Sequence, residues 1–218
     1  LVGSEMCIRD RPNEGSIPIE YCNIKKMNIT TYNQLEDIKQ IELSVPTNEL
    51  ELGLITQYCS SLEKIIIIGE VYSSINKHAN ILKGLDVKLE IKLDPKKLYN
   101  LADLRLFSTF FPNSYILYGY EDVTIHKFIN VYEKLDSMIK PIKNVELSPL
   151  EKFLYIFYIT SHFRKYKDVK YNEDKSRSLF ELFDPDNNQI VCGGFSKILM
   201  ELCKRINILA LKMYVHIY

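Results

Sequence analysis

The chain has 218 residues, 46% hydrophobic and 26% charged, the composition of an ordinary globular protein with room for one large domain or two small ones. Lysine plus arginine and aspartate plus glutamate both number 28. This zero formal net charge argues against a nucleic-acid-binding protein, which normally carries a basic excess. Apolar runs such as Ile65–Ile68 fall far short of about 18 residues, so no membrane-spanning segment is predicted.

Both ends of the chain have unusual sequences. Residues 1–11 resemble the translated adapter that recurs at the ends of reading frames assembled from environmental sequencing, so they are excluded from the fold prediction. Residues 12–34 form a poorly defined lead-in. The last residues, Val215 to Tyr218, are β-branched and aromatic with no turn after them, which indicates a strand cut short. We therefore expect the sequence to be a fragment that lacks its C-terminal part.

Residues 35–147 alternate short β-branched runs with helical periods, which predicts an α/β region. The sequence Asp94-Pro95 is typical of an N-cap followed by proline at the first helical position, so we expect a helix to begin there. Strands that alternate with helices predict parallel pairing through βα crossovers. The predicted strands are 38–45, 64–68, 87–93 and 115–118, and the predicted helices are 48–60, 73–83, the one that begins at Asp94 and 124–139.

The α/β region has two possible architectures. Leu35, Leu62 and Leu85 begin similar short motifs at intervals of 27 and 23 residues, a spacing typical of leucine-rich repeats. The characteristic asparagine and the dense leucine pattern of those repeats are absent, which favours a plain small parallel sheet. Both alternatives, a small parallel sheet and a leucine-rich-repeat-like stack, stay open.

A second region is predicted over residues 148–218. Ser148, with Glu151 three residues later and Pro149 between them, forms a capping box that begins a helix. Residues 164–177 are polar and irregular, and a short helix is expected over 179–183 before a turn at 184–188. The first of these helices has one stripe of mostly apolar residues, namely Leu150, Phe153, Leu154, Phe157, Tyr158 and Ser161.

Cys192 is the residue whose position in the sequence indicates a reactive side chain. After it, Phe195, Ile198 and Leu202 recur at helical spacing, so Cys192 is predicted in the first turn of an amphipathic helix. Unpaired N–H groups and the helix dipole favour a negatively charged side chain there, and the thiolate is the nucleophilic form of cysteine. The two glycines that follow leave space for a substrate backbone. The alternative is a buried core cysteine, because free cysteine is among the most buried residue types.

The passage around Cys192 resembles the bacterial transglutaminase-like superfamily. The resemblance is carried by Ser176-Arg177-Ser178-Leu179, then by Ile190-Val191-Cys192-Gly193-Gly194-Phe195-Ser196 and the leucine-rich helix after it. It implies that residues 148–218 are the helical front half of an α+β domain whose cysteine helix packs against an antiparallel sheet. It also implies that Cys192 is the nucleophile, that Gly193, Gly194 and Phe195 contact substrate, and that no cofactor is needed.

The activity that this resemblance implies is thiol acyl transfer on protein or peptide amides, as a peptidase or a cross-linking enzyme. A histidine that takes up the proton and an aspartate that orients it would follow the cysteine in such a family. His216 does not match the histidine motif, so an ordinary strand histidine is the default and the histidine and aspartate are expected beyond the chain. This chain is therefore expected to be inactive by itself.

The remaining candidate residues indicate no further site. His78 and His126 have no cysteine or carboxylate pattern typical of a metal site, and His162 is expected to be partly buried. The five cysteines have neither zinc-ligand nor disulfide spacing and favour a reducing compartment. The alternative to an enzyme is a protein-binding module made of βα repeats, with a degenerate cysteine domain.

Overall fold

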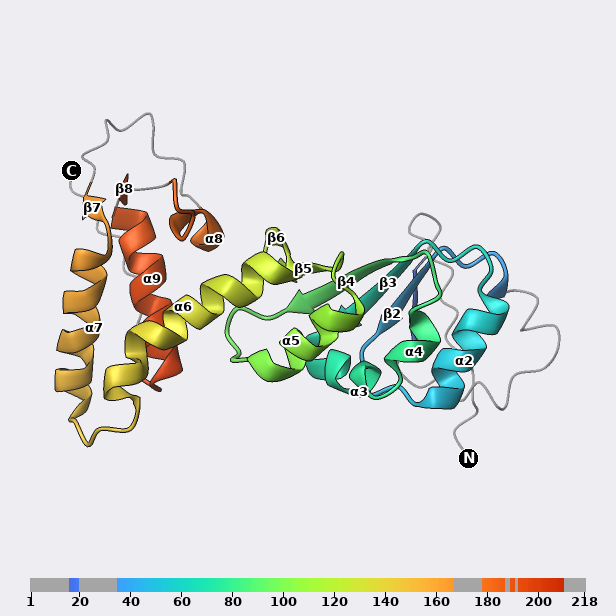
Figure 1. Cartoon of the computed structure of the whole chain (residues 1–218), viewed down its shortest axis with the longest axis horizontal. Coiled ribbons are helices and arrows are strands. Elements are labelled where there is room, and N and C mark those ends of the chain that lie inside the picture. The colour runs from blue at the N-terminus through green and yellow to red at the C-terminus, as the bar shows by residue number, and fades with distance from the viewer. Residues whose placement is uncertain (1–15, 20–34, 167–177, 187–188, 191, 210–218) are drawn as a thin grey trace. The chain divides into compact units, whose positions relative to one another are not determined.

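The computed structural model describes residues 16–19, 35–166, 178–186, 189–190 and 192–209 (Figure 1). The chain divides into two compact units, residues 1–126 and 127–218. The first is an α/β unit and the second is helical, and each is described by itself. No helix in the described ranges is both long and apolar enough to cross a lipid bilayer.

The first unit is built on a six-stranded sheet whose strands follow one another in chain order. The first five strands are parallel, as predicted, and the sixth pairs antiparallel with the fifth. The first and sixth strands were not predicted, and the expected strand over 38–45 is shorter. The strands are β1 (Ser16–Ile19), β2 (Gln40–Leu43), β3 (Lys64–Ile68), β4 (Lys88–Leu93), β5 (Tyr115–Tyr118) and β6 (Glu121–Thr124).

The crossover helices of this unit form one layer. They are α2 (Glu49–Tyr58), the 3-10 turn η2 (Gly69–Val71), α3 (Tyr72–Asn76), α4 (Ala79–Leu82) and α5 (Leu101–Phe110). Helix α2 packs against α4, and both α3 and α4 pack against α5, so successive crossovers lie on one face of the sheet (Figure 1). Alternate strand residues fill the core on that face because side chains of a strand point to opposite faces in turn. These residues include Ile41, Leu43, Ile65, Ile67, Ile91 and Ile116, all 0–1% exposed.

The sheet repeats every 24 residues through its first four strands. Ser16, Gln40, Lys64 and Lys88 are aligned across them. A doubly wound sheet reverses its strand order, whereas a stack of βα repeats keeps the strands in sequence. The strands thus form a small parallel sheet whose register repeats regularly, so the strand order agrees with both of the predicted alternatives. The intervals between Leu35, Leu62 and Leu85 differ from this period because each leucine lies a different number of residues before the strand that follows it.

The opposite face of the sheet carries charged side chains that pair with one another. The Lys64 Nζ lies 2.8 Å from Glu90 Oε2, and the Lys92 Nζ lies 3.7 Å from Glu42 Oε2. Glu42, Ile66 and Glu90 are aligned on neighbouring strands. Ile66 is only 3% exposed. The charged residues of this face thus form a cross-strand network around an apolar centre.

The helix expected to begin at Asp94 begins later. Pro95 comes two residues after Leu93, the last residue of β4. The Asp94 carbonyl accepts a hydrogen bond from the Lys97 amide, and the Asp94 carboxylate accepts one from the Lys96 amide, so residues 94–97 form a turn. Helix α5 begins at Leu101, and its N-cap is Asn100, whose side chain accepts a hydrogen bond from the Ala102 amide at 2.9 Å. The prediction was wrong because an aspartate before proline favours a turn as well as a helix start.

The second unit contains four helices and a two-stranded sheet within its described residues. They are α6 (Ile125–Lys143), α7 (Pro149–Phe163), β7 (Lys165–Tyr166), α8 (Leu179–Leu182), β8 (Gln189–Ile190) and α9 (Cys192–Arg205). The strands β7 and β8 are parallel. The units divide between His126 and Lys127, inside α6, so all but the first two residues of this helix belong to the second unit, whereas the predicted region begins at Ser148. The reason is packing: Phe128 of α6 lies 5.7 Å from the Phe180 ring of α8, measured between centroids.

Helix α7 begins as predicted but faces differently. Ser148 accepts a hydrogen bond from the Glu151 amide, and the Glu151 carboxylate accepts one from the Ser148 amide, so both halves of the capping box are present. The helix buries Ile156 and Thr160. Its predicted stripe is largely turned outward: the side chains of Leu150, Leu154, Phe157 and Tyr158 are 66%, 55%, 47% and 61% exposed. His162, expected to be partly buried, is exposed as well.

Candidate functional site

Cys192 is the first residue of α9 and is exposed, so the predicted helix start is confirmed. The amides of the first turn of a helix have no partner within the helix, and they are directed toward its N-terminal end. The Ser196 hydroxyl donates a hydrogen bond to the Cys192 carbonyl at 2.9 Å, one turn later. The thiol therefore stands at the start of a 14-residue helix, where solvent and small molecules reach it.

The segment before α9 is held by cationic side chains of two other helices. The Arg164 guanidinium donates a hydrogen bond to the Asp184 carbonyl at 3.3 Å, and Lys127 Nζ lies 3.8 Å from the Asp184 carboxylate. Lys134 Nζ donates to the Phe183 carbonyl at 3.5 Å. The Phe163 and Phe183 rings also meet, with centroids 4.9 Å apart. These contacts fix the turn after α8, which leads toward Cys192.

An aromatic contact positions the first turn of α9 against α7. Phe195, three residues after Cys192, meets Phe157 edge to face with centroids 5.5 Å apart. Phe195 is half-buried and Phe157 is 47% exposed, so the pair forms an apolar surface near the helix start. Phe157 was not among the predicted site residues, because nothing in the sequence indicates which residue of α7 lies against α9.

The two glycines after Cys192 have different surroundings. A Cβ atom added to Gly193 would meet nothing within 4 Å, so the space beside it is open. Gly194 is buried within the unit. Gly193 and Phe195 are therefore accessible from the thiol side, and Gly194 contributes to packing.

The other cysteines within the described residues are buried. Cys59 is the C-cap of α2 and is 5% exposed, and Cys203 lies in the last turn of α9 and is 0% exposed. Burial raises the pKa of the Cys59 thiol to about 11 and also raises the pKa of Cys203. Both thiols are therefore kept in the neutral form, which is a poor nucleophile. Cys7 and Cys22 lie outside the described residues.

No histidine of the described ranges bonds to Cys192. His162 Nδ1 instead lies 2.8 Å from the Tyr158 carbonyl and 3.0 Å from the Ser161 hydroxyl. Its ring is tilted against the Tyr158 ring, with centroids 4.3 Å apart. His78 and His126 belong to the first unit. Three of the residues discussed above, Ser176, Arg177 and His216, lie outside the described residues, as does the predicted strand at Val215 to Tyr218.

The chemistry that this arrangement supports is that of the one thiol that is accessible among the three described cysteines. Within the part of the chain that is described, no three His, Cys, Asp or Glu side chains are grouped so as to hold a metal ion. Comparisons with protein-family models, with curated proteins and with solved structures give no match. The functional assignment consequently depends on the geometry of Cys192 and on the motif around it.

Proposed function

We propose that Cys192 is the nucleophile of a transglutaminase-like cysteine enzyme that transfers acyl groups from protein or peptide amides. The observation that carries the proposal is its position: it is exposed in the first turn of an amphipathic helix, while Cys59 and Cys203 are buried. The first-turn amides of α9 have no partner within the helix and face the end at which this sulfur stands. The motif from Ile190 to Ser196 supports the same assignment.

The proposed reaction has two steps. The Cys192 sulfur attacks the amide carbonyl carbon, a C–S bond forms, and the C–N bond breaks as the leaving amine takes up the proton of the thiol. Water or a second amine then attacks the thioester carbonyl carbon, the C–S bond breaks, a carboxylic acid or a new amide is released, and the sulfur takes up the proton of the attacking group. Hydrolysis corresponds to a peptidase or amidase, and transfer to an amine corresponds to cross-linking.

The surroundings of the thiol indicate how an acyl donor would bind. The open space beside Gly193 accepts the backbone of an extended peptide, and the Phe157–Phe195 pair accepts an apolar side chain next to it. General-base catalysis requires a group within hydrogen-bond reach of the sulfur, and no described histidine meets that condition. We therefore expect no detectable turnover of amides by this chain, but rapid reaction with activated acyl donors, whose leaving group needs no proton.

An activated ester tests the nucleophile directly. The chain is mixed with p-nitrophenyl acetate at about pH 7, and the modified cysteine is identified by peptide mass spectrometry. Attack by Cys192 forms the C–S bond, breaks the C–O bond and releases p-nitrophenolate. We expect a burst of about one p-nitrophenolate per chain and an acetyl group on Cys192, because nucleophilic catalysis by cysteine proceeds through such an intermediate.

Two variants serve as controls. Cys192→Ala should abolish the burst, and Cys203→Ala, which removes a buried thiol of the same helix, should retain it. A burst of the same size in Cys192→Ala, or acetylation of another cysteine first, would contradict the proposal. Denaturant should remove the preference for Cys192, because the helix start and the burial of the other two thiols are lost together.

A second function is favoured by the first unit. Its sequential parallel strands with a 24-residue register are typical of repeat proteins, which bind partners through extended surfaces. In this alternative the chain is a protein-binding module and the cysteine domain is degenerate. Absence of acyl transfer to Cys192, together with saturable binding of a protein partner by the first unit, would favour it.

A further inference from the structure

An uncharged line of side chains runs along the exposed side of α7 in the second unit. Its four residues follow one another at intervals of four, three and four, and we call them the α7 seam: Leu150, Leu154, Phe157 and Ser161. The first three are 66%, 55% and 47% exposed, and Ser161 is exposed as well. Tyr158, beside the seam, is 61% exposed. An exposed apolar surface of this extent marks an interaction site.

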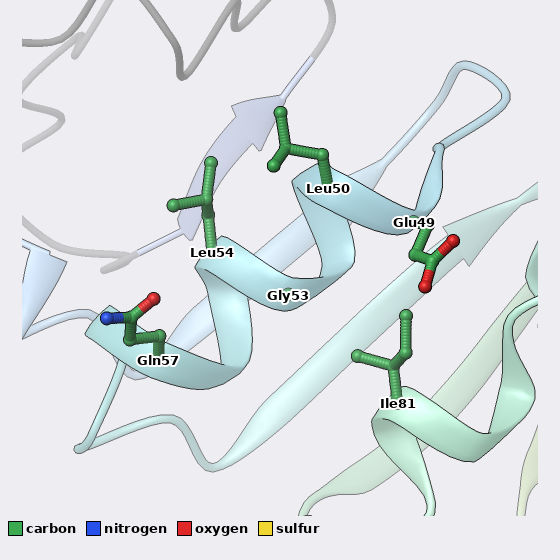
Figure 2. A pocket seen from close by; sticks show the side chains of 6 residues that line it. All are labelled: Glu49, Leu50, Gly53, Leu54, Gln57 and Ile81. Atoms are coloured by element: carbon green, nitrogen blue, oxygen red, sulfur yellow. The ribbon is translucent and has the colours of Figure 1, made fainter.

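The spacing of the seam indicates what kind of element covers it. Intervals that alternate between three and four residues are the pattern by which one helix packs along another. Helix α2 offers a contrast: in Figure 2, Leu50 and Leu54 extend from the same side of α2, but the next position of that line is Gln57, which is polar. The apolar line of α2 thus ends after one turn, whereas that of α7 continues to Phe157, a second turn along the helix.

The α7 seam is complementary to itself when two copies lie antiparallel. A two-fold axis that brings Leu154 of one copy against Phe157 of the other also brings Phe157 of the first against Leu154 of the second. The same register places Leu150 against Ser161 at both ends, so a large side chain meets a small one. No seam position carries a charge, and the pair therefore buries no unpaired charge. A second copy of this chain satisfies all four positions at once.

The area of the seam is sufficient for a dimer. Four exposed side chains leave about 500 Å² of mainly apolar surface on each copy, namely those of Leu150, Leu154, Phe157 and Tyr158. Two copies would bury about 1,000 Å² through these residues alone, which is the lower limit of a specific interface. We therefore expect a dimer that forms at high concentration and dissociates on dilution.

We propose that two copies of this chain form a dimer in which their α7 seams pack antiparallel across a two-fold axis. Each Phe157 then lies between Phe195 of its own chain, which its ring already meets, and Leu154 of the second copy. The second copy thereby adds an apolar side chain to the surface near Cys192. The dimer does not depend on the reactivity of the thiol, so Cys192→Ala should dimerise like the wild type.

Sedimentation equilibrium of the full chain tests the proposal. We expect the mass of two chains at about 200 µM and increasing dissociation on dilution toward about 1 µM, as suits an interface near the lower size limit. Leu154→Glu should stay monomeric at about 200 µM, because a dimer would bury the introduced charges near the two-fold axis. The control is Leu106→Glu, the same change at a leucine of α5 that is 46% exposed, which should dimerise like the wild type. Circular dichroism shows whether both variants are folded.

Mixtures of variants test the antiparallel register. Leu150→Lys and Ser161→Glu should each weaken dimerisation at least about tenfold, and their equimolar mixture should restore it, because the introduced lysine of one chain meets the introduced glutamate of the other. A mixture of Leu150→Lys and Leu150→Glu should not restore it, because these positions lie at opposite ends of an antiparallel pair.

Three outcomes would overturn the proposal. The first is a monomeric wild type at about 200 µM, which would assign the seam to a different occupant. The second is a dimer that persists in Leu154→Glu or is lost equally in Leu106→Glu. The third is a mixture that restores the dimer only when both changes are at Leu150. None of these outcomes affects acetylation of Cys192, so the two proposals fail separately.

Discussion

The rings of Phe157 and Phe195 meet edge to face with centroids 5.5 Å apart, and this contact joins α7 to the first turn of the cysteine helix. Edge-to-face pairs of this kind add stability beyond the area that they bury. Because Cys192 precedes Phe195 by less than one turn, the pair also orients the helix start at which the thiol stands.

Phe157→Ala should lower the free energy of unfolding by about 1 kcal/mol, the usual value of an aromatic pair. The side chain is 47% exposed, so the loss comes mainly from the contact with Phe195 and less from burial. The urea midpoint is the measurement. The control is Leu154→Ala, one turn earlier on the same helix and 55% exposed, which should change stability by less than about 0.5 kcal/mol. Equal losses in both variants would contradict the role of the contact.

Cys59 should make the fold sensitive to alkaline pH. Burial raises its pKa from 9.0 to about 11, so the folded state favours the neutral thiol. A group with a raised pKa stabilises the fold fully below the pKa of the unfolded chain, and this contribution is lost as pH rises from about 9 to about 11. We expect a loss of about 2 kcal/mol over that range from this residue.

The test compares the wild type with Cys59→Val, which removes the titrating group at similar size. The free energy of unfolding, measured with urea at about pH 8 and about pH 10.5, should fall less between these two pH values in Cys59→Val than in the wild type. Burial also raises the pKa of Tyr72 and of Cys203, so part of the loss should remain in the variant. A loss of the same size in both proteins would show that the Cys59 thiol does not contribute.

The capping box of α7 should stabilise the second unit in a pH-dependent way. Hydrogen bonds from the Ser148 hydroxyl and amide lower the pKa of Glu151. The Glu151 carboxylate therefore stabilises the fold at pH values above the ordinary pKa of glutamate, and this stabilisation is lost as the pH falls through the lowered pKa. Ser148→Ala should cost about 1 kcal/mol at neutral pH and less in acid, measured by urea unfolding at both pH values.

A serine elsewhere provides the control for this prediction. Ser137 lies inside α6, where its hydroxyl donates to the Lys134 carbonyl one turn earlier. It caps nothing, so Ser137→Ala should leave stability unchanged or raise it slightly, since alanine is the better helix former. A loss in Ser137→Ala as large as that in Ser148→Ala would argue that the serine hydroxyl acts through something other than the cap.

Two glycines should respond to alanine in opposite directions. Gly53→Ala should raise the free energy of unfolding by about 0.5–1 kcal/mol, because the helix gains propensity and the added Cβ meets nothing within 4 Å. Gly119→Ala should lower it by about 1–2 kcal/mol, because Gly119 has φ +65° and a Cβ would lie 3.0 Å from Pro95 Cγ. Thermal unfolding of both variants is the measurement. A loss in Gly53→Ala would show that the α2 backbone requires glycine.

The local sequence was sufficient for several elements. The strands 64–68 and 115–118 have the predicted bounds, the Ser148 capping box is formed, and Cys192 begins its helix. Each of these depends on residues within about one helical turn or one strand, so the pattern contains the needed information.

Other features depend on residues far apart in the chain. The order of the strands, the outward-facing stripe of α7 and the contact of Phe157 with Phe195 follow from which elements pack together, and no spacing along the sequence specifies that. The stripe illustrates the reason. Its spacing is the same whether it faces the core or solvent, and only the packing of Ile156 and Thr160 on the other side of α7 determines which face is buried.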